Sequence, residues 1–475
     1  MSNDSSGARL TTALRAWIAA APPGAKLPST RALVAEHRVS PVTVQQALRS
    51  LTALGEIETR PGIGTFVRVE RAARPVDLGW QTAALGAVGR RNPASPTSLQ
   101  PSDGDAIGLH SGYPARELLP ERLVRPALAR AARSEALLGR PPVAGIPELR
   151  SWFAAELAAL TSAGVGPVGT RDVVVTPGSQ GALLTTFRAL VGAGRPLVME
   201  SPTYWGAILA AEQAGVDVVP VPSGPSGPDP DVVRRVLAET GARAFYAQPA
   251  FASPTGAVWD TERAEAVLDA VRTAGAFLIE DDYARDFGID AAPVPLAARD
   301  DAGHVVYIRS LSKSVAPAVR VAAVIARGPA RDRILADTQA DAMYVSGVLQ
   351  AVALEVVTTP AWSTHLRRLG RDLGERRDLL LHSLHDHAPA VAVDAVPRGG
   401  LALWARLPAE IDLGAVVDRC RRDGLVVGPG DEWFPAEPTG NHLRLAYAGP
   451  QPERFPEAAA ILQEAITRTG WRPTA

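Results

Sequence analysis

The feature that most restricts the fold of this chain is a regular alternation of strand-length apolar runs with helical stretches between residues 107 and 475. Each run is short enough to form one buried strand. Strands that alternate with helices usually pair in parallel, so the pattern predicts an α/β domain with a large, mostly parallel sheet. The seven runs span residues 173–176, 197–200, 216–219, 243–247, 277–280, 305–308 and 321–325.

The segments that follow these runs carry most of the residues with useful chemistry. The first run is followed by PGSQGALL, the second by SPTYWG and the fourth by QPAFASPTG. The fifth is followed by DDYARDF and the sixth by RSLSK. The carboxyl ends of parallel strands meet at one edge of a sheet, where α/β folds place their ligands. We therefore expect these segments to form one site.

One of these segments contains a lysine, and lysine is rare in this chain. Of 49 Lys and Arg residues, only Lys26 and Lys313 are lysines. An ε-amine can lose its proton near neutral pH and condense with an aldehyde, whereas a guanidinium stays protonated. We interpret Lys313 as a Schiff-base lysine. For the residue taken alone, a surface lysine or a phosphate-pairing lysine is the alternative.

The other segments offer what pyridoxal phosphate (PLP) requires at its phosphate. Gly178, Ser179 and Gln180 open a helix, and the N–H groups at a helix start bind phosphate. Ser310 and Arg320 flank Lys313 and add a hydroxyl and a bidentate guanidinium. These five residues are the predicted phosphate site.

Three further residues suit the pyridine ring. Tyr204 offers a flat face for stacking, Asp281 can keep the ring nitrogen protonated, and Tyr283 can hydrogen-bond the phenolic oxygen. Each alone has a plain structural explanation, such as a turn or a surface ion pair. Together and in this order they predict a PLP site.

The first 70 residues have a different pattern. Leu10, Leu14 and Trp17 recur at helical spacing, and Ser29 and Ser40 can each cap a following helix. The segment EIETRPGIGTFVRV then reads as two short strands joined by a turn. Two short helices, a tight turn and this hairpin predict a winged helix-turn-helix.

This head resembles the GntR family of bacterial regulators. The resemblance rests on LPSTR, VSPVTVQQAL and RPGIGTFV, and it departs from the family at Pro41, where arginine is common. It implies operator DNA as a partner. A solvated polar face is the alternative for any one of the implied contacts, which are Arg31, Thr43, Gln45, Arg49, Arg60 and Gly62.

The body resembles the fold-type I aminotransferases of class I and II, and the whole chain resembles a MocR-type regulator. SLSK and EDDY carry the resemblance for the lysine and for the ring partners. In NHLRLAYAG, Arg444 matches the arginine that receives a substrate carboxylate. Ser253 stands where the family has an asparagine that bonds the cofactor's O3′. Arg140 stands where the family often has a tyrosine that reaches the partner subunit's phosphate.

Composition and charge restrict the possible partners, metal sites and cellular compartment of the protein. Residues 1–75 contain ten Lys or Arg and five Asp or Glu, a net charge of +5, so with −1 overall the other 400 residues carry −6. A basic head suits a polyanion partner. Cys420 is the single cysteine, so neither an internal disulfide nor a cysteine-built metal site is expected, and no metal is predicted. No signal peptide or membrane-spanning run is recognisable, so we expect a cytoplasmic protein.

The predicted organisation is a DNA-binding domain at 1–70, a linker at 71–106 and a PLP-binding body at 107–475, with a small C-terminal subdomain from about 330. The leading hypothesis is a homodimeric transcriptional regulator that senses PLP or an amino compound forming an aldimine with it. A working aminotransferase with an accessory head is the first alternative. A GntR regulator that binds a metabolite without a covalent cofactor is the second.

Overall fold

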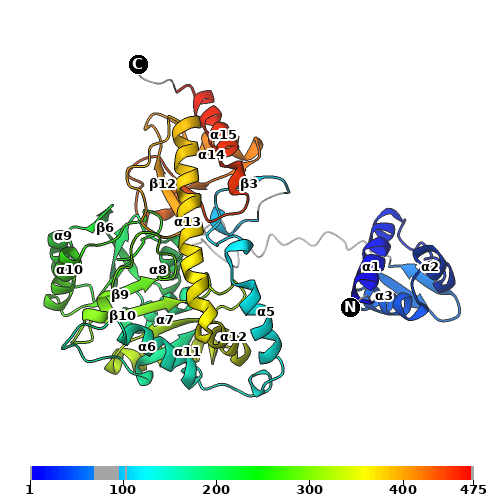
Figure 1. Ribbon diagram of the computed structural model, residues 1–475, viewed down its shortest axis with the longest axis horizontal. Helices are drawn as coiled ribbons and strands as arrows, with labels where there is room; N and C mark the ends of the chain where they lie inside the picture. Colours follow the sequence, from blue (N-terminus) through cyan, green and yellow to red (C-terminus); the bar gives the residue numbers. More distant parts are fainter. Residues whose placement is uncertain (1–2, 69–95, 102–103, 472–475) are drawn as a thin grey trace. The chain divides into compact units, whose positions relative to one another are not determined.

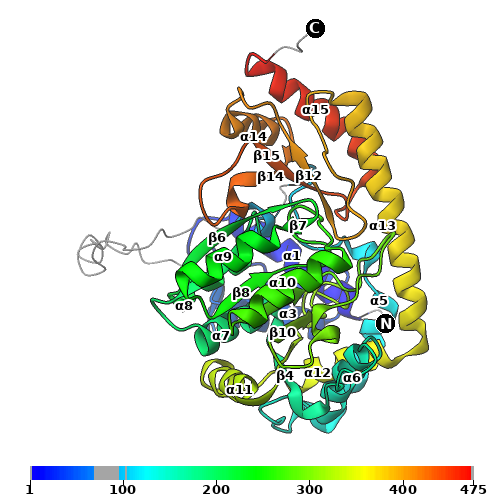
Figure 2. The same cartoon turned by 90° about the vertical axis from the view of Figure 1, so that its left-hand side faces the viewer.

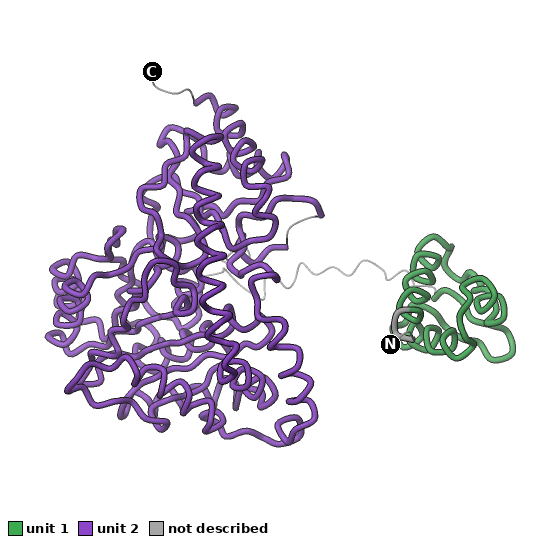
Figure 3. The backbone as a smooth tube through the Cα atoms, in the orientation of Figure 1, with its two compact units in different colours: residues 1–91 green, residues 92–475 purple. Residues whose placement is uncertain are grey.

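The chain forms two compact units, Met1–Arg91 and Asn92–Ala475 (Figure 3). The computed structural model describes residues 3–68, 96–101 and 104–471 of them. Trp80 and Leu85, two apolar residues of the linker predicted at 71–106, lie outside the described residues.

The first unit is the winged helix-turn-helix that the sequence predicted. The side-chain oxygens of Ser29 and Ser40 accept hydrogen bonds from backbone N–H groups at the starts of the second and third helices, which stabilises both ends. The two strands form an antiparallel hairpin, with Ile57 opposite Val67. The elements are α1 (Asn3–Ala20), α2 (Thr30–His37), α3 (Pro41–Ala53), β1 (Ile57–Arg60) and β2 (Gly64–Val67).

A small core holds these elements together. Leu14 of α1, Leu33 of α2 and Leu51 of α3 are buried against one another, and Ile57 of the hairpin joins them. The i, i+3 and i+4 spacing that predicted amphipathic helices is therefore the spacing of residues that face this core.

The second unit contains an eight-stranded sheet in the order β4-β11-β10-β9-β8-β5-β6-β7. The pairs from β10 to β6 are parallel, whereas β11 runs antiparallel to both β10 and β4. All seven predicted strands are present. The strands are β4 (Val173–Thr176), β5 (Pro196–Ser201), β6 (Asp217–Gly224), β7 (Gly227–Pro228), β8 (Ala244–Ala247), β9 (Phe277–Asp282), β10 (Val305–Ser310) and β11 (Ala322–Ile325).

Helices cover both faces of this sheet, which explains why most residues of its central strands are apolar and buried. Val306 and Ile308 of β10 face α7 (Gly178–Leu190), α8 (Trp205–Ala214) and α11 (Gly328–Ala342). Alternate residues of the strands face the other side, where α9 and α10 lie side by side (Figure 2). The helices of that side are α6 (Pro147–Ala158), α9 (Pro230–Thr240), α10 (Thr261–Thr273) and α12 (Gly347–Thr358).

A smaller part lies beside the large sheet, and the long helix α13 (Pro360–His387) extends from one to the other (Figure 1). The three-stranded sheet of this smaller part has the order β12-β15-β14, and Cys420 is buried in the core of the same part. The predicted start near residue 330 falls in α11, which packs on the large sheet. The elements of the smaller part are α14 (Leu413–Arg422), α15 (Phe455–Arg468), β12 (Ala402–Arg406), β14 (Gly428–Pro429) and β15 (His442–Ala446).

The start of the body also joins this smaller part. The short strand β3 (Ile107–Gly108) pairs in parallel with β13 (Leu425–Val426). Within the described ranges, none of the helices is both long and apolar enough to cross a membrane.

Candidate functional site

The candidate site is a cavity of about 490 Å³ at the carboxyl ends of the large sheet's strands. Segments at the carboxyl ends of the large sheet's strands supply several of the lining residues, and β15 of the smaller part supplies Arg444. The predicted residues that line the cavity are Ser179, Gln180, Tyr204, Ser253, Ser310, Lys313, Arg320 and Arg444. Residues far apart in the sequence thus meet at the edge where the strand pattern placed them.

Lys313 lies among aromatic rings. Its Nζ is 4.3 Å from the ring centre of Tyr283, 5.7 Å from that of Tyr204 and 5.9 Å from that of Tyr113. Burial, helped by the charges of Arg444 and Arg320, lowers the pKa of Lys313 to about 7. A large share of its amine is therefore neutral near pH 7, the state that a nucleophilic amine needs.

Asp281 is the penultimate residue of β9 (Phe277–Asp282) and is fully buried. Its Oδ2 accepts hydrogen bonds from the Tyr246 hydroxyl at 2.9 Å and from Nε2 of Gln248 at 2.8 Å. Its Oδ1 is buried without a hydrogen-bond partner among the described residues. Burial raises the pKa of Asp281 to about 6, and the two donors and the charge of Lys313 oppose this rise. Oδ2 is thus held in place by two donors, whereas Oδ1 remains able to accept a hydrogen bond from a ligand.

Tyr283 and Ser253 lie together beside Lys313. The Tyr283 hydroxyl donates to the carbonyl of Phe251 at 3.2 Å. Burial raises the pKa of Tyr283 to about 12, although Arg444 and a hydrogen bond with Ser253 lower it. The backbone N–H of Ser253 donates to Oε1 of Gln248 at 2.9 Å. The same Gln248 side chain therefore positions both Asp281 and the Ser253 loop.

At the far end, Arg320 packs over the start of α7. Its Nη2 donates to the carbonyl of Pro177 at 3.3 Å. A Cβ placed on Gly178 would stand 2.6 Å from that nitrogen, so only glycine fits at this position, where φ is +80°. The N-cap residue Pro177 makes no side-chain hydrogen bond to α7, so within the described part of the chain the first N–H groups of this helix are available to a ligand. A guanidinium over an uncapped helix start makes an anion-binding corner.

Hydroxyl groups complete this corner. The Ser310 Oγ accepts from the Ser312 N–H at 3.3 Å, which leaves its own proton free to donate. The Ser312 hydroxyl lines the cavity and is buried without a partner among the described residues. The Gln180 side chain instead donates to the carbonyl of Gly206 at 2.7 Å, so Gln180 can serve an anion through its backbone.

Arg444 is 3% exposed and reaches the cavity from β15. Its Nη1 donates to the carbonyls of Ser111 at 3.0 Å and His110 at 3.4 Å, and its guanidinium lies 5.2 Å from the ring centre of Trp433. Its Nε has no partner within the described chain, and burial lowers its pKa. A buried cation without an acidic partner is suited to receive a carboxylate.

A family comparison explains this arrangement. Residues 105–462 match the model of aminotransferase class I and II. The chain belongs to this family. The match confirms the fold class that the sequence predicted, and with it PLP as the cofactor.

The first unit of this aminotransferase-family chain matches a second model. Residues 7–67 match the bacterial regulatory proteins of the gntR family. The predicted resemblance to a MocR-type regulator, a GntR head joined to an aminotransferase-like body, is thereby confirmed.

The similar proteins include transcriptional regulators that match most of this chain and an aminotransferase of known structure. The HTH-type transcriptional regulator YdfD of Bacillus subtilis is 27% identical over 90% of this chain and 89% of its own length. The probable rhizopine catabolism regulatory protein MocR of Rhizobium meliloti is 29% identical over 93% and 89%. The structure of LysN, an α-aminoadipate aminotransferase of Thermus thermophilus complexed with N-(5′-phosphopyridoxyl)-L-leucine, is 28% identical with a TM-score of 0.71, covering 77% of this chain and 93% of that chain.

The residues present fit the family's cofactor. The Oδ1 of Asp281, which has no partner among the described residues, suits a protonated ring nitrogen. The Ser312 hydroxyl, also without a described partner, and the uncapped start of α7 line the same cavity and suit a phosphate. The close contact of Arg320 with Gly178 leaves the guanidinium beside that corner. When bound, PLP supplies an aldehyde that condenses with amines and a ring that withdraws electrons.

The predicted DNA contacts lie on the surface of the GntR unit. Arg31, Gln45 and Arg49 are exposed, and the last two are four residues apart on one face of α3. Thr43 is half-buried, and its hydroxyl is within 2.8 Å of the Ser40 hydroxyl at the helix cap. Arg60 bonds Glu58 and lies 4.7 Å from the ring centre of Phe66. Gly62, with φ at +73°, forms the tip of the wing.

The sequence reasoning missed residues that line the cavity, among them Tyr113 and Trp433, and two that hold Asp281, Gln248 and Tyr246. Gln248 could have been found, because it directly follows a strand, as the other site residues do. Tyr246 lies within its strand. Tyr113 comes from a loop and Trp433 ends the 3-10 turn η6 (Gly430–Trp433), and neither segment has a pattern that points to the cavity. Arg140 lies in an exposed stretch and is absent from the cavity lining of its own chain, so its reach to a partner subunit stays a prediction.

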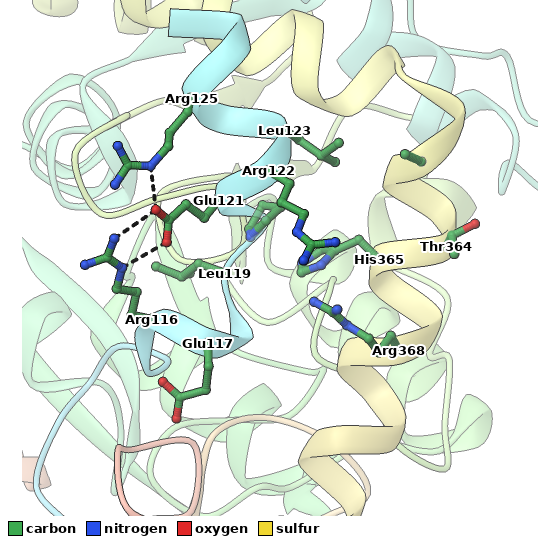
Figure 4. A pocket seen from close by; sticks show the side chains of 12 residues that line it. Arg116, Glu117, Leu119, Glu121, Arg122, Leu123, Arg125, Thr364, His365 and Arg368 are labelled. Atoms are coloured by element: carbon green, nitrogen blue, oxygen red, sulfur yellow. Dashed lines mark hydrogen bonds and ion pairs between the residues drawn. The ribbon is translucent and has the colours of Figure 1, made fainter. Parts of the chain in front are cut away.

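A larger hollow of about 760 Å³ lies elsewhere, between α5 (Glu121–Ala131) and α13 (Figure 4). Arg116 and Arg125 both reach Glu121, and together they lower its pKa to about 2. None of the predicted site residues lines this groove. The smaller cavity around Lys313 is therefore the candidate site.

Proposed function

We propose that this chain is a PLP-dependent transcriptional regulator. Its first unit binds operator DNA, and its second unit binds PLP and, through it, a small amino compound that acts as effector. The observation that carries the proposal is the union in one chain of a GntR head with an exposed recognition helix and a buried PLP site. A purely metabolic enzyme has no use for such a head.

The relatives support this reading. YdfD and MocR, which match this chain over nearly their whole length, are named as regulators. LysN holds a phosphopyridoxyl group joined to leucine, an amino acid with one carboxylate. An effector held at the same two points, its amine and its carboxylate, fits the positions of Lys313 and Arg444 in one cavity.

Each side chain then has a role in binding. Lys313 offers a neutral amine to the aldehyde, and Asp281 holds a proton on the ring nitrogen. Tyr283 faces the phenolic oxygen, and Tyr204 covers the ring. Arg320, Ser310 and the N–H groups of Gly178, Ser179 and Gln180 hold the phosphate. Arg444 receives the effector's carboxylate.

The active form in this proposal is a cytoplasmic homodimer that binds paired DNA half-sites. One winged helix-turn-helix contacts too little DNA for tight specific binding, whereas two contact twice as much. Because Arg31 and Arg49 are exposed cations, binding should weaken steeply as salt rises.

A working aminotransferase is the second candidate, and one observation favours it. The pKa of Lys313 near 7 lets the same amine accept and return a proton. Ser253 argues for slow turnover, because a serine is shorter than the asparagine that usually helps hold O3′.

The test uses the full chain loaded with PLP and DNA selected by that chain from a random-sequence pool. DNA affinity is followed by fluorescence anisotropy while amino acids are added, and keto-acid release is measured in parallel. The proposal expects a shift in DNA affinity with little keto acid. Many turnovers with unchanged DNA affinity would assign the chain to the aminotransferases instead.

A further inference from the structure

A short piece of the segment that joins the two units is docked onto the body. Thr97 begins a single turn, η1 (Thr97–Leu99), and is buried. Its backbone N–H donates to both carboxylate oxygens of Glu432, at 3.0 and 3.2 Å, and its hydroxyl donates to one of them at 2.7 Å. Two further contacts hold residues 96–101. A ring nitrogen of His110 lies 2.9 Å from the Gln100 carbonyl, and the Gly112 N–H donates to the Ser98 carbonyl.

The same piece is a wall of the cofactor cavity. Pro96, Ser98 and Leu99 line the cavity together with Lys313 and Arg444. Leu99 keeps 53% of its surface exposed, although its neighbours Thr97 and Ser98 are buried. The anchoring Glu432 directly precedes Trp433, whose ring lies against Arg444 and Tyr204. A ligand between Lys313 and Arg444 therefore shares a cavity with residues 96–101.

The charges of the lining restrict the chemistry of that ligand. The only charged side chains that line the described cavity are Lys313, Arg320 and Arg444, all of them basic. Arg320 lies at the phosphate corner, so Arg444 remains for one carboxylate. The lining offers no carboxylate to pair with a second ammonium group on the ligand, and its basic side chains would repel that group. For a second carboxylate on the ligand, the lining that this chain supplies holds no further guanidinium.

Most of the lining surface is apolar. Leu99, Trp205, Leu209 and Pro96 contribute to it, and the neutral polar groups of the lining are chiefly serine hydroxyls, two tyrosine hydroxyls and the amides of Gln180 and Gln213. An apolar side chain placed against Leu99 would remove water from both, which favours binding. The lining thus suits an amino acid that has a single carboxylate and an uncharged, apolar side chain.

We infer that residues 96–101 form a wall that recognises the effector as an amino acid with an apolar side chain, and that this contact strengthens the Thr97–Glu432 anchor. The inference rests on the proposed function. Because binding equilibria are reciprocal, a ligand that tightens the docked wall must itself bind more weakly when the anchor is removed. The wall belongs to the segment that leads to the DNA-binding head, so its docking is the physical link between an occupied cavity and the head.

The first experiment uses the full chain loaded with PLP and three probes, L-leucine, L-glutamate and L-lysine. Affinity is read from the change in the cofactor's visible absorption. L-Leucine should bind at least about tenfold more tightly than the other two. Hydrogen exchange at residues 97–99 should slow when L-leucine is added. Tighter binding of L-glutamate or L-lysine, or exchange that L-leucine leaves unchanged, would overturn the inference.

The second experiment removes the anchor. Glu432→Ala should weaken L-leucine binding about tenfold, since it removes hydrogen bonds to a charged group, and should abolish the DNA response while PLP is retained. Glu437→Ala, an exposed glutamate in the same loop, is the matched control and should behave as the natural chain. Equal L-leucine affinity in the Glu432→Ala and natural chains would contradict the proposed link.

A third variant guards against misfolding of the anchor variant. Leu99→Ser alters an exposed side chain and should narrow the preference for L-leucine over L-glutamate, whereas an unchanged preference counts against the inference. Failure of the proposed function gives a different result, because the natural chain would then fail to bind PLP or DNA at all. If the natural chain binds both and the variants behave like it, only the role of residues 96–101 is lost.

Discussion

In the first unit the candidate DNA-contacting side chains lie on the outside of α2, α3 and the wing, whereas in the second unit the cofactor-site side chains lie at buried strand ends. Arg31 and Arg49 are exposed, but Arg444 is 3% exposed and Asp281 is 1% exposed. Water and salt screen the first pair of charges and hardly reach the second pair.

This difference teaches which solution variable should control each unit. Exposed cations attract a polyanion at long range, so ionic strength should set DNA affinity. Buried groups have shifted pKa values, about 7 for Lys313 and about 6 for Asp281, so pH should set the chemistry of the cavity. Substitutions in one unit should therefore leave the properties of the other unit unchanged.

Lys313→Ala should abolish the borohydride-trappable bond between the chain and PLP. No other lysine lines the cavity, and Lys26, the second lysine of the chain, belongs to the head. Mass spectrometry of the reduced protein measures the adduct, and Lys26→Ala is the matched control. An undiminished adduct in the Lys313→Ala protein would rule out Lys313 as the attachment point.

Leu51→Ala should destabilise the first unit by about 2–5 kcal/mol, because it leaves a cavity in a small core. The cofactor's absorption and the unfolding of the second unit should not change. Denaturant titration followed by far-UV dichroism and by cofactor absorption separates the two units. Glu36→Ala, an exposed substitution on α2, serves as control. A parallel loss of stability in both units would show that they unfold as one.

The rate of PLP attachment to the cofactor-free chain should fall about tenfold between pH 8 and pH 6. The pKa of Lys313 is lowered to about 7, so its reactive neutral form predominates above that pH and is lost below it. Stopped-flow absorption gives the rate. A flat profile over this range would mean that the amine is not the titrating group.

Arg49→Ala should weaken DNA binding about five- to tenfold and reduce the dependence of binding on salt by about one phosphate contact. The side chain is exposed, so its removal should leave the fold of the head unchanged. Anisotropy at several salt concentrations measures both quantities, with Glu36→Ala again as control. An altered affinity with an unchanged salt dependence would mean that Arg49 does not contact phosphate.

Ser253→Asn should raise the rate of amino transfer about fivefold. One neutral hydrogen bond to O3′ is worth about 1 kcal/mol. Single-turnover spectra with a set of amino acids measure the rate, and Ser253→Ala should show no such gain. If the asparagine leaves the rate of amino transfer unchanged, Ser253 is not the cause of slow turnover.

Much of the molecule follows from local pattern. The period of the apolar residues and the capping serines predicted the helices of the head. The seven apolar runs predicted the large sheet, since a strand covered on both faces must be apolar throughout. Lys313 and Asp281 were recognisable because each lies next to a strand end, where position along the chain almost determines position in space.

Other features depend on distant parts of the chain and had no local signal. Gln248 reaches Asp281, Trp433 meets Arg444, and Thr97 bonds Glu432 across 335 residues. The pKa of Lys313 depends on burial and on Arg444, which the sequence places 131 positions away. Local periodicity reports which face of an element is buried. Only the packing of those elements decides which charges share one dry cavity, and that packing sets the chemistry of the site.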